Sequence, residues 1–373
     1  MVQKPNNNRL LFLVFAFLFF LAGFTSLVYQ VAWQRVLTQV IGIDAYSLTL
    51  IIAIFMAGLG FGGLFGSRIV SAEMNAPLLL ALLQLFMGVF GIVSVPVIRE
   101  YNGIIGNAFG FSFVIFMNFL LLFLPTLLMG ITTPLMVHVF RNSYSAGRAA
   151  SWAYSVNVFG AATGALISGI VMIGTLGLTK TCQLTGGLDI LIGLSLYLLS
   201  QKAYTAKSKS TLVTLAEATR SLLYEAFFDQ TSKATHLLIL SSFIVGFVAL
   251  AYEIAYFRLF TSYFGVTPYV FPILLFAYLM NMSLGVFLVG RLLKRFREEP
   301  LFFIFAVFAL IFTLPIQYLQ KFFLKVGYFQ PLLVLDSSFT IFEYNLPHIV
   351  KALVLSLILM TPIAFISVFS LSL

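Results

Sequence analysis

Long apolar runs separated by short polar segments make up most of the chain. Ten of these runs come close to the length that a helix needs to cross ~30 Å of hydrocarbon, and we predict a transmembrane helix for each. Six lie in the first half, and four follow a polar connector at 201–234. The predicted spans cover about 10–30, 45–67, 77–98, 112–139, 152–176, 183–200, 236–257, 267–290, 300–319 and 348–371.

The first run follows the basic residues Lys4 and Arg9, as the apolar part of a signal peptide does. It continues from Leu10 to Leu27 without an obvious small-residue cleavage site. We therefore predict that it is retained as the first transmembrane helix.

Part of the chain is repeated at a constant offset of 223 residues. Residues 23–35 read GFTSLVYQVAWQR, and residues 246–258 read GFVALAYEIAYFR. Between 23 and 68, eleven of forty-six positions are identical to their partners, where such a composition would match at roughly one position in ten by chance. A long-period repeat of this kind predicts two homologous halves, which we place at 1–200 and 235–373, joined by a cytoplasmic connector at 201–234.

The second half has two spans fewer than the first. Its last residues align loosely with the fourth span, Pro362 against Pro125. Nothing then corresponds to the fifth and sixth spans. Two explanations stay open, a naturally short second repeat and a fragment of a longer chain.

The distribution of basic residues predicts the orientation. With a cytoplasmic N-terminus, fourteen Lys and Arg lie in inside segments and seven outside, as the positive-inside rule requires. Six spans bring the chain back to the side where it began, so the two halves would be parallel repeats. Such repeats are related by a pseudo-twofold axis along the membrane normal, as in the major facilitator superfamily.

Composition agrees with an all-α, polytopic integral membrane protein. Hydrophobic residues make up 61% of the 373 residues and charged residues 9%, which excludes a soluble globule. The net charge of +9 lies in short gaps between apolar runs, where topology explains it better than nucleic-acid binding. A single cysteine, Cys182, excludes an internal disulfide and is interpreted as a packing residue.

Four blocks in order carry a family resemblance: SLVYQVAWQR, GIDAYSLTLIIAIFMAGLGFGGLFGSRI, LPTLLMGITTPL and AYSVNVFGAATGALISGIVMIGTLGL. Together they resemble the membrane part of the bacterial fused transporter-like/spermidine synthase-like proteins. The resemblance implies a multi-pass protein of the bacterial inner membrane. It also implies a cytoplasmic aminopropyltransferase-like domain as a partner, with its catalytic residues outside these 373 residues.

Small residues at fourth positions predict close helix packing. Gly58, Gly62 and Gly66 share one helical stripe, which lets a neighbouring helix approach closely. Gly160 and Gly164 repeat the pattern in the fifth span. GLGFGG at 58–63 also fits a dinucleotide-binding pattern, but no βαβ unit surrounds it, so we expect no cofactor there.

Polar residues within spans are the candidates for a binding site, because burying them is costly. Gln30 and Glu253 are equivalent in the two repeats, and each is flanked by an aromatic strip. We therefore predict a substrate site between the repeats, where a carboxyl could pair with an arginine. Its predicted residues are Tyr29, Gln30, Arg35, Tyr252, Glu253 and Arg258.

An alternative explains the same aromatic and basic residues. Tyr29, Trp33, Tyr252 and the two arginines could form an ordinary belt at the membrane interface. No histidine pair has the spacing of a metal site, and we predict neither a metal nor a catalytic residue. A polyamine substrate should meet several carboxylates, yet the spans offer only Glu253 and, near a predicted edge, Asp189.

Two functions follow from these observations. In the first, the chain is a transporter-like carrier with a polar site reaching the middle of the membrane. In the second, it is a membrane anchor or partner-binding scaffold for an aminopropyltransferase-like domain. A polar cavity would distinguish them, because an anchor can be packed solid.

Overall fold

The computed structural model describes residues 5–42, 44–70, 75–108, 110–141, 146–203 and 269–292, with short pieces at 254–255, 257, 340–341, 344–345 and 357. The described chain is almost entirely helical. Its helices are α1 (Pro5–Ile41), α2 (Asp44–Ile69), α3 (Ala76–Ala108), α4 (Phe111–Arg141), α5 (Ala146–Ile167), the π-helical segment η1 (Ser168–Met172), α6 (Ile173–Ala203) and α9 (Val270–Leu292).

Five helical segments of the described residues are long and apolar enough to cross a membrane. This confirms the prediction of a helical membrane protein in its coarse form. One element was not predicted, a two-stranded antiparallel hairpin of β1 (Thr340–Ile341) and β2 (Tyr344–Asn345). The predicted spans 300–319 and 348–371 lie outside the described residues, except for Leu357.

The chain divides into two compact units. Unit 1 comprises residues 1–164 and 175–230, and unit 2 comprises residues 165–174 and 231–373. The short segment 165–174 therefore belongs with the second part of the chain, which the sequence did not suggest.

Local signals in the sequence set several helix ends in unit 1. α1 stops where Gly42 adopts φ +76° and donates its N–H to the Thr38 carbonyl at 2.8 Å, a conformation that glycine adopts at low cost. α3 begins after Asn75, whose side-chain oxygen accepts from the Leu78 N–H at 3.1 Å. That bond satisfies a donor left unpaired at a helix start.

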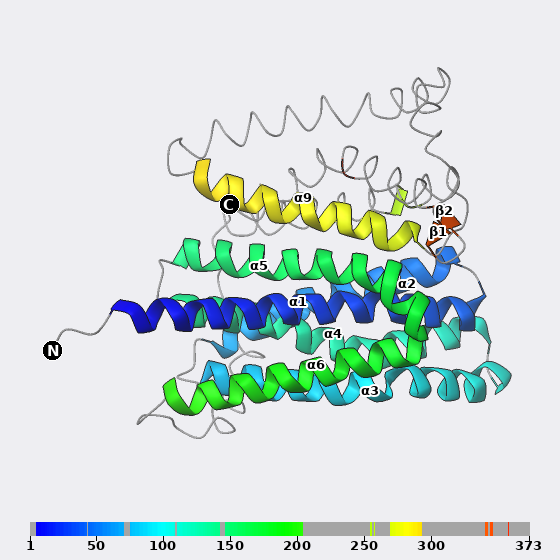
Figure 1. Ribbon diagram of the computed structural model, residues 1–373. Helices are drawn as coiled ribbons and strands as arrows, with labels where there is room; N and C mark the ends of the chain where they lie inside the picture. The colour runs from blue at the N-terminus through cyan, green and yellow to red at the C-terminus, as the bar shows by residue number, and fades with distance from the viewer. Residues whose placement is uncertain are drawn as a thin grey trace, which may run out of the picture. The chain divides into compact units, whose positions relative to one another are not determined.

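The fifth and sixth predicted spans lie in one continuous helical stretch of 54 residues, Arg148–Gln201. A straight helix of that length would measure roughly 80 Å, far more than the ~30 Å of a bilayer core. Gly177 breaks it with φ 75° and ψ 170°, and beyond this break α6 runs back in the direction opposite to α5 (Figure 1). The break lies between the two predicted spans.

The glycine stripe of α2 lies directly against α4. A Cβ added to Gly62 would collide with the Leu127 carbonyl, and one added to Gly66 would come within 2.5 Å of the Pro134 ring. Gly58 stands in the same way against Thr126. Gly60 and Gly63, on other faces of α2, meet nothing within 4 Å. The stripe therefore brings the two backbones together, as small residues do between membrane helices.

Glycines also mediate two further helix contacts in unit 1. Gly160 and Gly164 of α5 stand against the Phe20 and Phe24 carbonyls of α1. On the other side of the unit, Gly88 of α3 faces the Gly186 carbonyl of α6 at 2.7 Å from its added Cβ. α1 accordingly runs between α5 and the pair α3 and α6 (Figure 1).

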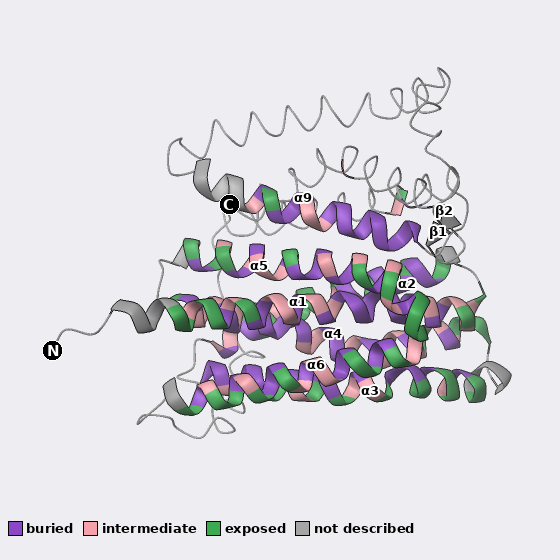
Figure 2. Ribbon diagram, viewed as in Figure 1, coloured by how far each residue is buried: buried purple, intermediate pink, exposed green. Residues whose placement is uncertain are grey.

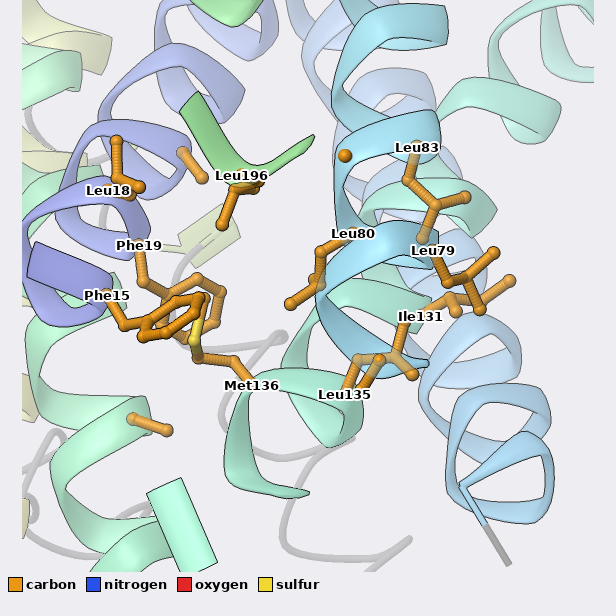
Figure 3. Close-up of a cluster of buried hydrophobic side chains, with 14 of the residues drawn as sticks. Phe15, Leu18, Phe19, Leu79, Leu80, Leu83, Ile131, Leu135, Met136 and Leu196 are labelled. Carbon is orange, nitrogen blue, oxygen red and sulfur yellow. The ribbon is translucent and has the colours of Figure 1, made fainter. Parts of the chain in front are cut away.

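An apolar cluster in unit 1 contains buried side chains from each of the helices α1 to α6. The side chains labelled in Figure 3 converge from α1, α3, α4 and α6. The labelled members are Phe15, Leu18, Phe19, Leu79, Leu80, Leu83, Ile131, Leu135, Met136 and Leu196. Buried faces point inward along each helix, and large apolar residues such as Leu64, Leu124 and Leu191 remain exposed (Figure 2). So much exposed apolar surface suits contact with a lipid bilayer.

In unit 2, α9 covers residues that the predicted repeat pairs with α2. It ends at Leu292, which is 223 residues after Ile69, the end of α2. Every position of 47–63 that is buried in α2 is also buried at its equivalent in α9. Where α2 has Gly58, α9 has Asn281, which donates to the Leu357 carbonyl at 3.0 Å. The C-terminal ends of the two helices therefore agree with the predicted register, whereas α9 begins three residues later than that register requires, and the two parallel repeats stay a prediction.

Candidate functional site

Five side chains from three helices of unit 1 form a buried group that we call the polar centre. Its members are Thr25, Tyr29 and Trp33 of α1, Ser94 of α3 and Asp189 of α6. The Tyr29 hydroxyl donates to Asp189 Oδ2 at 2.9 Å. The Trp33 indole N–H donates to the Ser94 hydroxyl at 3.0 Å. Two hydrogen bonds thus tie α1 to both α6 and α3.

The helical period of α1 brings its aromatic members together. Tyr29 and Trp33 are four residues apart, so they share one face of the helix. Their rings stack with centroids 5.1 Å apart and planes inclined by 18°. Both side chains are fully buried, and each presents its polar atom to a neighbouring helix while the ring fills apolar space.

Gly91 of α3 makes room for the Tyr29 hydroxyl. A Cβ added at Gly91 would collide with that hydroxyl and the adjoining ring carbons. One turn further on, the Ser94 hydroxyl donates to the Gly91 carbonyl at 2.9 Å. The absence of a side chain at Gly91 therefore allows Tyr29 to reach Asp189.

Asp189 is the chemically distinctive member of the polar centre. Only 1% of its surface is exposed, and its Oδ1 atom has no hydrogen-bond partner among the residues that the structure describes. The Thr25 hydroxyl lies within hydrogen-bonding reach of this carboxyl. In the structure it donates a hydrogen bond to the Ala22 carbonyl at 3.0 Å. A buried carboxyl with an open oxygen can take up a proton or a donor group.

The polar centre lies at the middle of its spans. The midpoint of Leu10–Ile41 falls between Thr25 and Ser26, and that of Ala76–Ile104 falls at Phe90, next to Gly91. The segment from Gly177 to Gln201 has Asp189 at its midpoint. If these helices cross a bilayer symmetrically, the acid lies near the midplane, where an ionisable residue is costly and usually functional.

A second polar group lies farther along α1, between α1 and the start of α2. The Gln34 amide donates to the Thr38 hydroxyl at 3.1 Å and to the Ser47 hydroxyl at 3.4 Å. The two hydroxyls are themselves 2.6 Å apart. These neutral groups satisfy one another, so we assign them to helix packing.

Asn102 of α3 and Asn118 of α4 form a reciprocal pair. Each amide nitrogen donates to the other's oxygen, at 2.9 and 2.6 Å. Each also donates to the backbone of its own helix, Asn102 to the Ile98 carbonyl and Asn118 to the Val114 carbonyl. This pair is closed and uncharged, and it offers no obvious position for a ligand.

Of the predicted site residues, the structure places one in the polar centre. Tyr29 contacts Asp189, Gln30 is buried on α1, and Arg35 is partly buried. The burial of Tyr29 and Trp33 disagrees with an interfacial belt for these two side chains. Tyr252, Glu253 and Arg258 lie outside the described residues, so the predicted pairing across the repeats stays a prediction.

Asp189, Ser94 and Gly91 were missed as site residues. Asp189 was placed near the edge of a span drawn from 183, but α6 already begins at Ile173. The spacing of polar residues could have revealed Asp189. Thr181, Thr185 and Asp189 follow one another at intervals of four residues, and all three are buried on α6. Thr181 and Thr185 bond to carbonyls four residues earlier, at 2.7 and 2.8 Å, which lets their polar groups sit in an apolar span.

Comparison with known proteins assigns no function to the chain. No protein-family model matches it, and no curated protein matches it either. Among the described residues, no group of three or more His, Cys, Asp or Glu is placed to hold a metal ion. The function must therefore be argued from the polar centre itself.

Proposed function

We propose that this chain is a transporter-like membrane module and that the polar centre of unit 1 is its functional site. The observation that supports this most directly is the burial of Asp189 with one open oxygen in a bundle of apolar helices. A bundle that served only to anchor another domain would gain nothing from a carboxyl there, because neutral contacts like those of α2 and α4 hold helices at lower cost. A carrier, in contrast, needs a polar group at the middle of the membrane.

The number of spans, their arrangement in repeats and their orientation are proposals that rest on the sequence. We propose ten spans in two parallel repeats, a pseudo-twofold axis along the membrane normal, and a cytoplasmic N-terminus in a bacterial inner membrane. The family resemblance supports a module of a spermidine synthase-like protein, which would work with a cytoplasmic aminopropyltransferase-like domain.

The proposed orientation can be checked by labelling from outside intact cells. In a Cys182→Ser background, a cysteine at Lys209 should resist an impermeant thiol reagent, whereas one at Lys325 should react. Reaction at Lys209 would contradict both the cytoplasmic connector and the parallel repeats.

A non-transporting anchor is the second candidate function. It is favoured by the complete burial of Tyr29 and Trp33, whose rings fill the space that a permanent cavity would need. For a carrier, the same observation means that the helices must separate before a ligand can reach Asp189. The two functions therefore differ in whether the polar centre opens.

The native thiol at Cys182 offers a direct test of opening. It is the one cysteine of the chain, fully buried, and two helical turns from Asp189 on α6. The test is alkylation by N-ethylmaleimide in membranes that contain the full chain, with the modified fraction measured by mass spectrometry. A carrier should expose Cys182 intermittently, so it should be alkylated over time.

A matched buried control uses the apolar cluster. In the Cys182→Ser, Leu135→Cys double variant, the thiol replaces a fully buried side chain in a region where no opening is proposed. We expect alkylation at Cys182 and none at Leu135→Cys. If neither thiol reacts, the anchor function is supported and the carrier proposal fails.

A further inference from the structure

We propose that Asp189 is a proton-binding site whose protonation keeps α1, α3 and α6 together, so that opening of the polar centre is coupled to proton release. This inference rests on the proposed carrier function and adds the ligand, a proton. Thr25 and Tyr29 act as positioning residues for the Asp189 carboxyl.

A proton on Asp189 completes the hydrogen-bonding pattern that the structure shows. The Tyr29 hydroxyl already donates to Oδ2, and the Thr25 hydroxyl directs its hydrogen to the Ala22 carbonyl. The Thr25 oxygen keeps a free lone pair, which can accept a hydrogen carried by Oδ1. While the Thr25 hydrogen lies on the Ala22 carbonyl, Oδ1 of an ionised Asp189 has no donor among the described residues.

The surroundings favour a proton over a metal cation. A metal ion such as Ca²⁺ or Na⁺ requires several oxygen ligands around it. Here one carboxyl oxygen is occupied by a Tyr29 donor, and the stacked rings of Tyr29 and Trp33 fill the adjoining space. A proton needs neither a second carboxylate nor added volume.

Few charged or titratable groups face Asp189. On α1 the titratable neighbour is Tyr29. On α6 it is Cys182, which interacts electrostatically with Tyr29. α3 contributes Gly91 and Ser94, which do not titrate in this range. Within the described part of the chain no basic group acts on the Asp189 carboxyl, so its charge is not balanced by an ion pair there.

Proton release must therefore change the packing of the polar centre. An ionised carboxyl in a dry apolar interior is strongly disfavoured unless water or a donor reaches it. Water can reach Oδ1 only if α1 moves away from α3 and α6, because Tyr29, Trp33 and Asp189 are buried at their contact. The protonated form is the closed form, and the ionised form is the open, hydrated form.

The direct test is infrared difference spectroscopy of the purified full chain between acid and alkaline pH. We expect a C=O band of a protonated carboxyl in the wild type that disappears on raising the pH. The band should be absent from Asp189→Asn and retained in Glu100→Gln, the same chemical change at an exposed acid of α3. If Asp189→Asn fails to fold, labelling the four aspartates with ¹³C should shift a protonated-carboxyl band that persists above the pH at which exposed carboxyls ionise.

Two results would overturn the inference. Absence, at every pH, of a band that Asp189→Asn removes would mean that Asp189 is always ionised, and persistence of that band at every pH would mean that it is permanently protonated. Either result would leave the carrier proposal standing if Cys182 is still alkylated. A pH-dependent band without alkylation of Cys182 would instead defeat both the carrier proposal and the coupling to opening, and only the proton-binding site at Asp189 would remain.

Coupling to opening is tested on Cys182. Asp189→Asn imitates the protonated carboxyl, so it should hold the unit closed and slow alkylation by N-ethylmaleimide roughly tenfold. Removing a nearby negative charge would by itself favour the thiolate and speed the reaction. Slower alkylation therefore reports closure, and an equal or faster rate would contradict the coupling.

Discussion

Along α2 and α4 the helices touch through glycines, whereas α1 meets α3 and α6 through hydrogen-bonding side chains. At Gly58, Gly62 and Gly66 the two backbones approach so closely that a single added methyl group would collide. At the polar centre the contacts between helices are made instead by the side chains of Tyr29, Trp33, Ser94 and Asp189. The first contact has no group that can change its charge under ordinary conditions. The second contains an acid, so only the second can respond to its surroundings.

This difference matters because lipid tails are as apolar as the helix surfaces. Association of membrane helices relies on close packing and hydrogen bonds rather than on exclusion of water. The glycine contact uses the first means and the polar centre uses the second. We therefore expect substitutions in the glycine contact to change stability alone, and those in the polar centre to change stability and pH response together.

The largest effect is expected for Gly62→Leu. Its side chain would be forced into the Leu127 carbonyl, and overpacking of this kind costs about 3 kcal/mol or more. Gly63→Leu is the matched control, since a Cβ there meets nothing within 4 Å, and it should cost less than about 0.5 kcal/mol. Unfolding by denaturant in detergent, followed by circular dichroism, measures both. Equal losses would contradict the assigned contact between α2 and α4.

Gly91→Ala should have the next largest effect. The added methyl displaces the Tyr29 hydroxyl from Asp189, which we expect to cost about 1–2 kcal/mol, since a buried acceptor loses its partner. It should also alter the pH at which the carboxyl band disappears. Gly103→Ala on the same helix adds a methyl that meets nothing within 4 Å, and it should leave both properties unchanged. A stability loss without any change in the band would separate Tyr29 from the titration of Asp189.

The Asn102–Asn118 pair is polar but contains no acid, so it is intermediate between the glycine contact and the polar centre. Replacing Asn102 by Leu breaks its pair with Asn118 and should cost about 1 kcal/mol. Because both groups are neutral, the loss should be the same at acid and alkaline pH. A double-mutant cycle with Asn118→Leu measures the coupling, and a strongly pH-dependent value would show that the asparagines are linked to a titrating group.

The smallest effect is expected at the exposed end of α1. Arg99 donates to the Gln39 side chain at 3.2 Å on the surface. Exposed contacts of long side chains contribute little, so Gln39→Ala should change the free energy of unfolding by less than about 0.5 kcal/mol. A larger loss of stability in the same denaturation assay would mean that this contact holds the ends of α1 and α3 together.

The glycine contact could be predicted from the sequence, but the polar centre only in part. Spacing by four residues places Gly58, Gly62 and Gly66 on one face whatever the partner helix is, and likewise Tyr29 and Trp33. Contacts across helices depend on which helices are neighbours, and no local pattern fixes that. Asp189 was undervalued because the polar residues Thr179, Lys180 and Thr181 interrupt the apolar run, although the helix continues through them.

The break at Gly177 also bears on how the acid-bearing helix enters the bilayer during synthesis. No long polar loop separates α5 from α6, so the two can leave the insertion machinery as a helical hairpin. Arg148 near the start of α5 and Lys202 near the end of α6 would then anchor both ends of the hairpin on one side. Inserting an acid at a helix centre is disfavoured by roughly 2.5–3.5 kcal/mol, and the apolar α5, inserted in the same step, offsets that cost for α6. A long polar loop at this position would oblige α6 to enter the lipid alone.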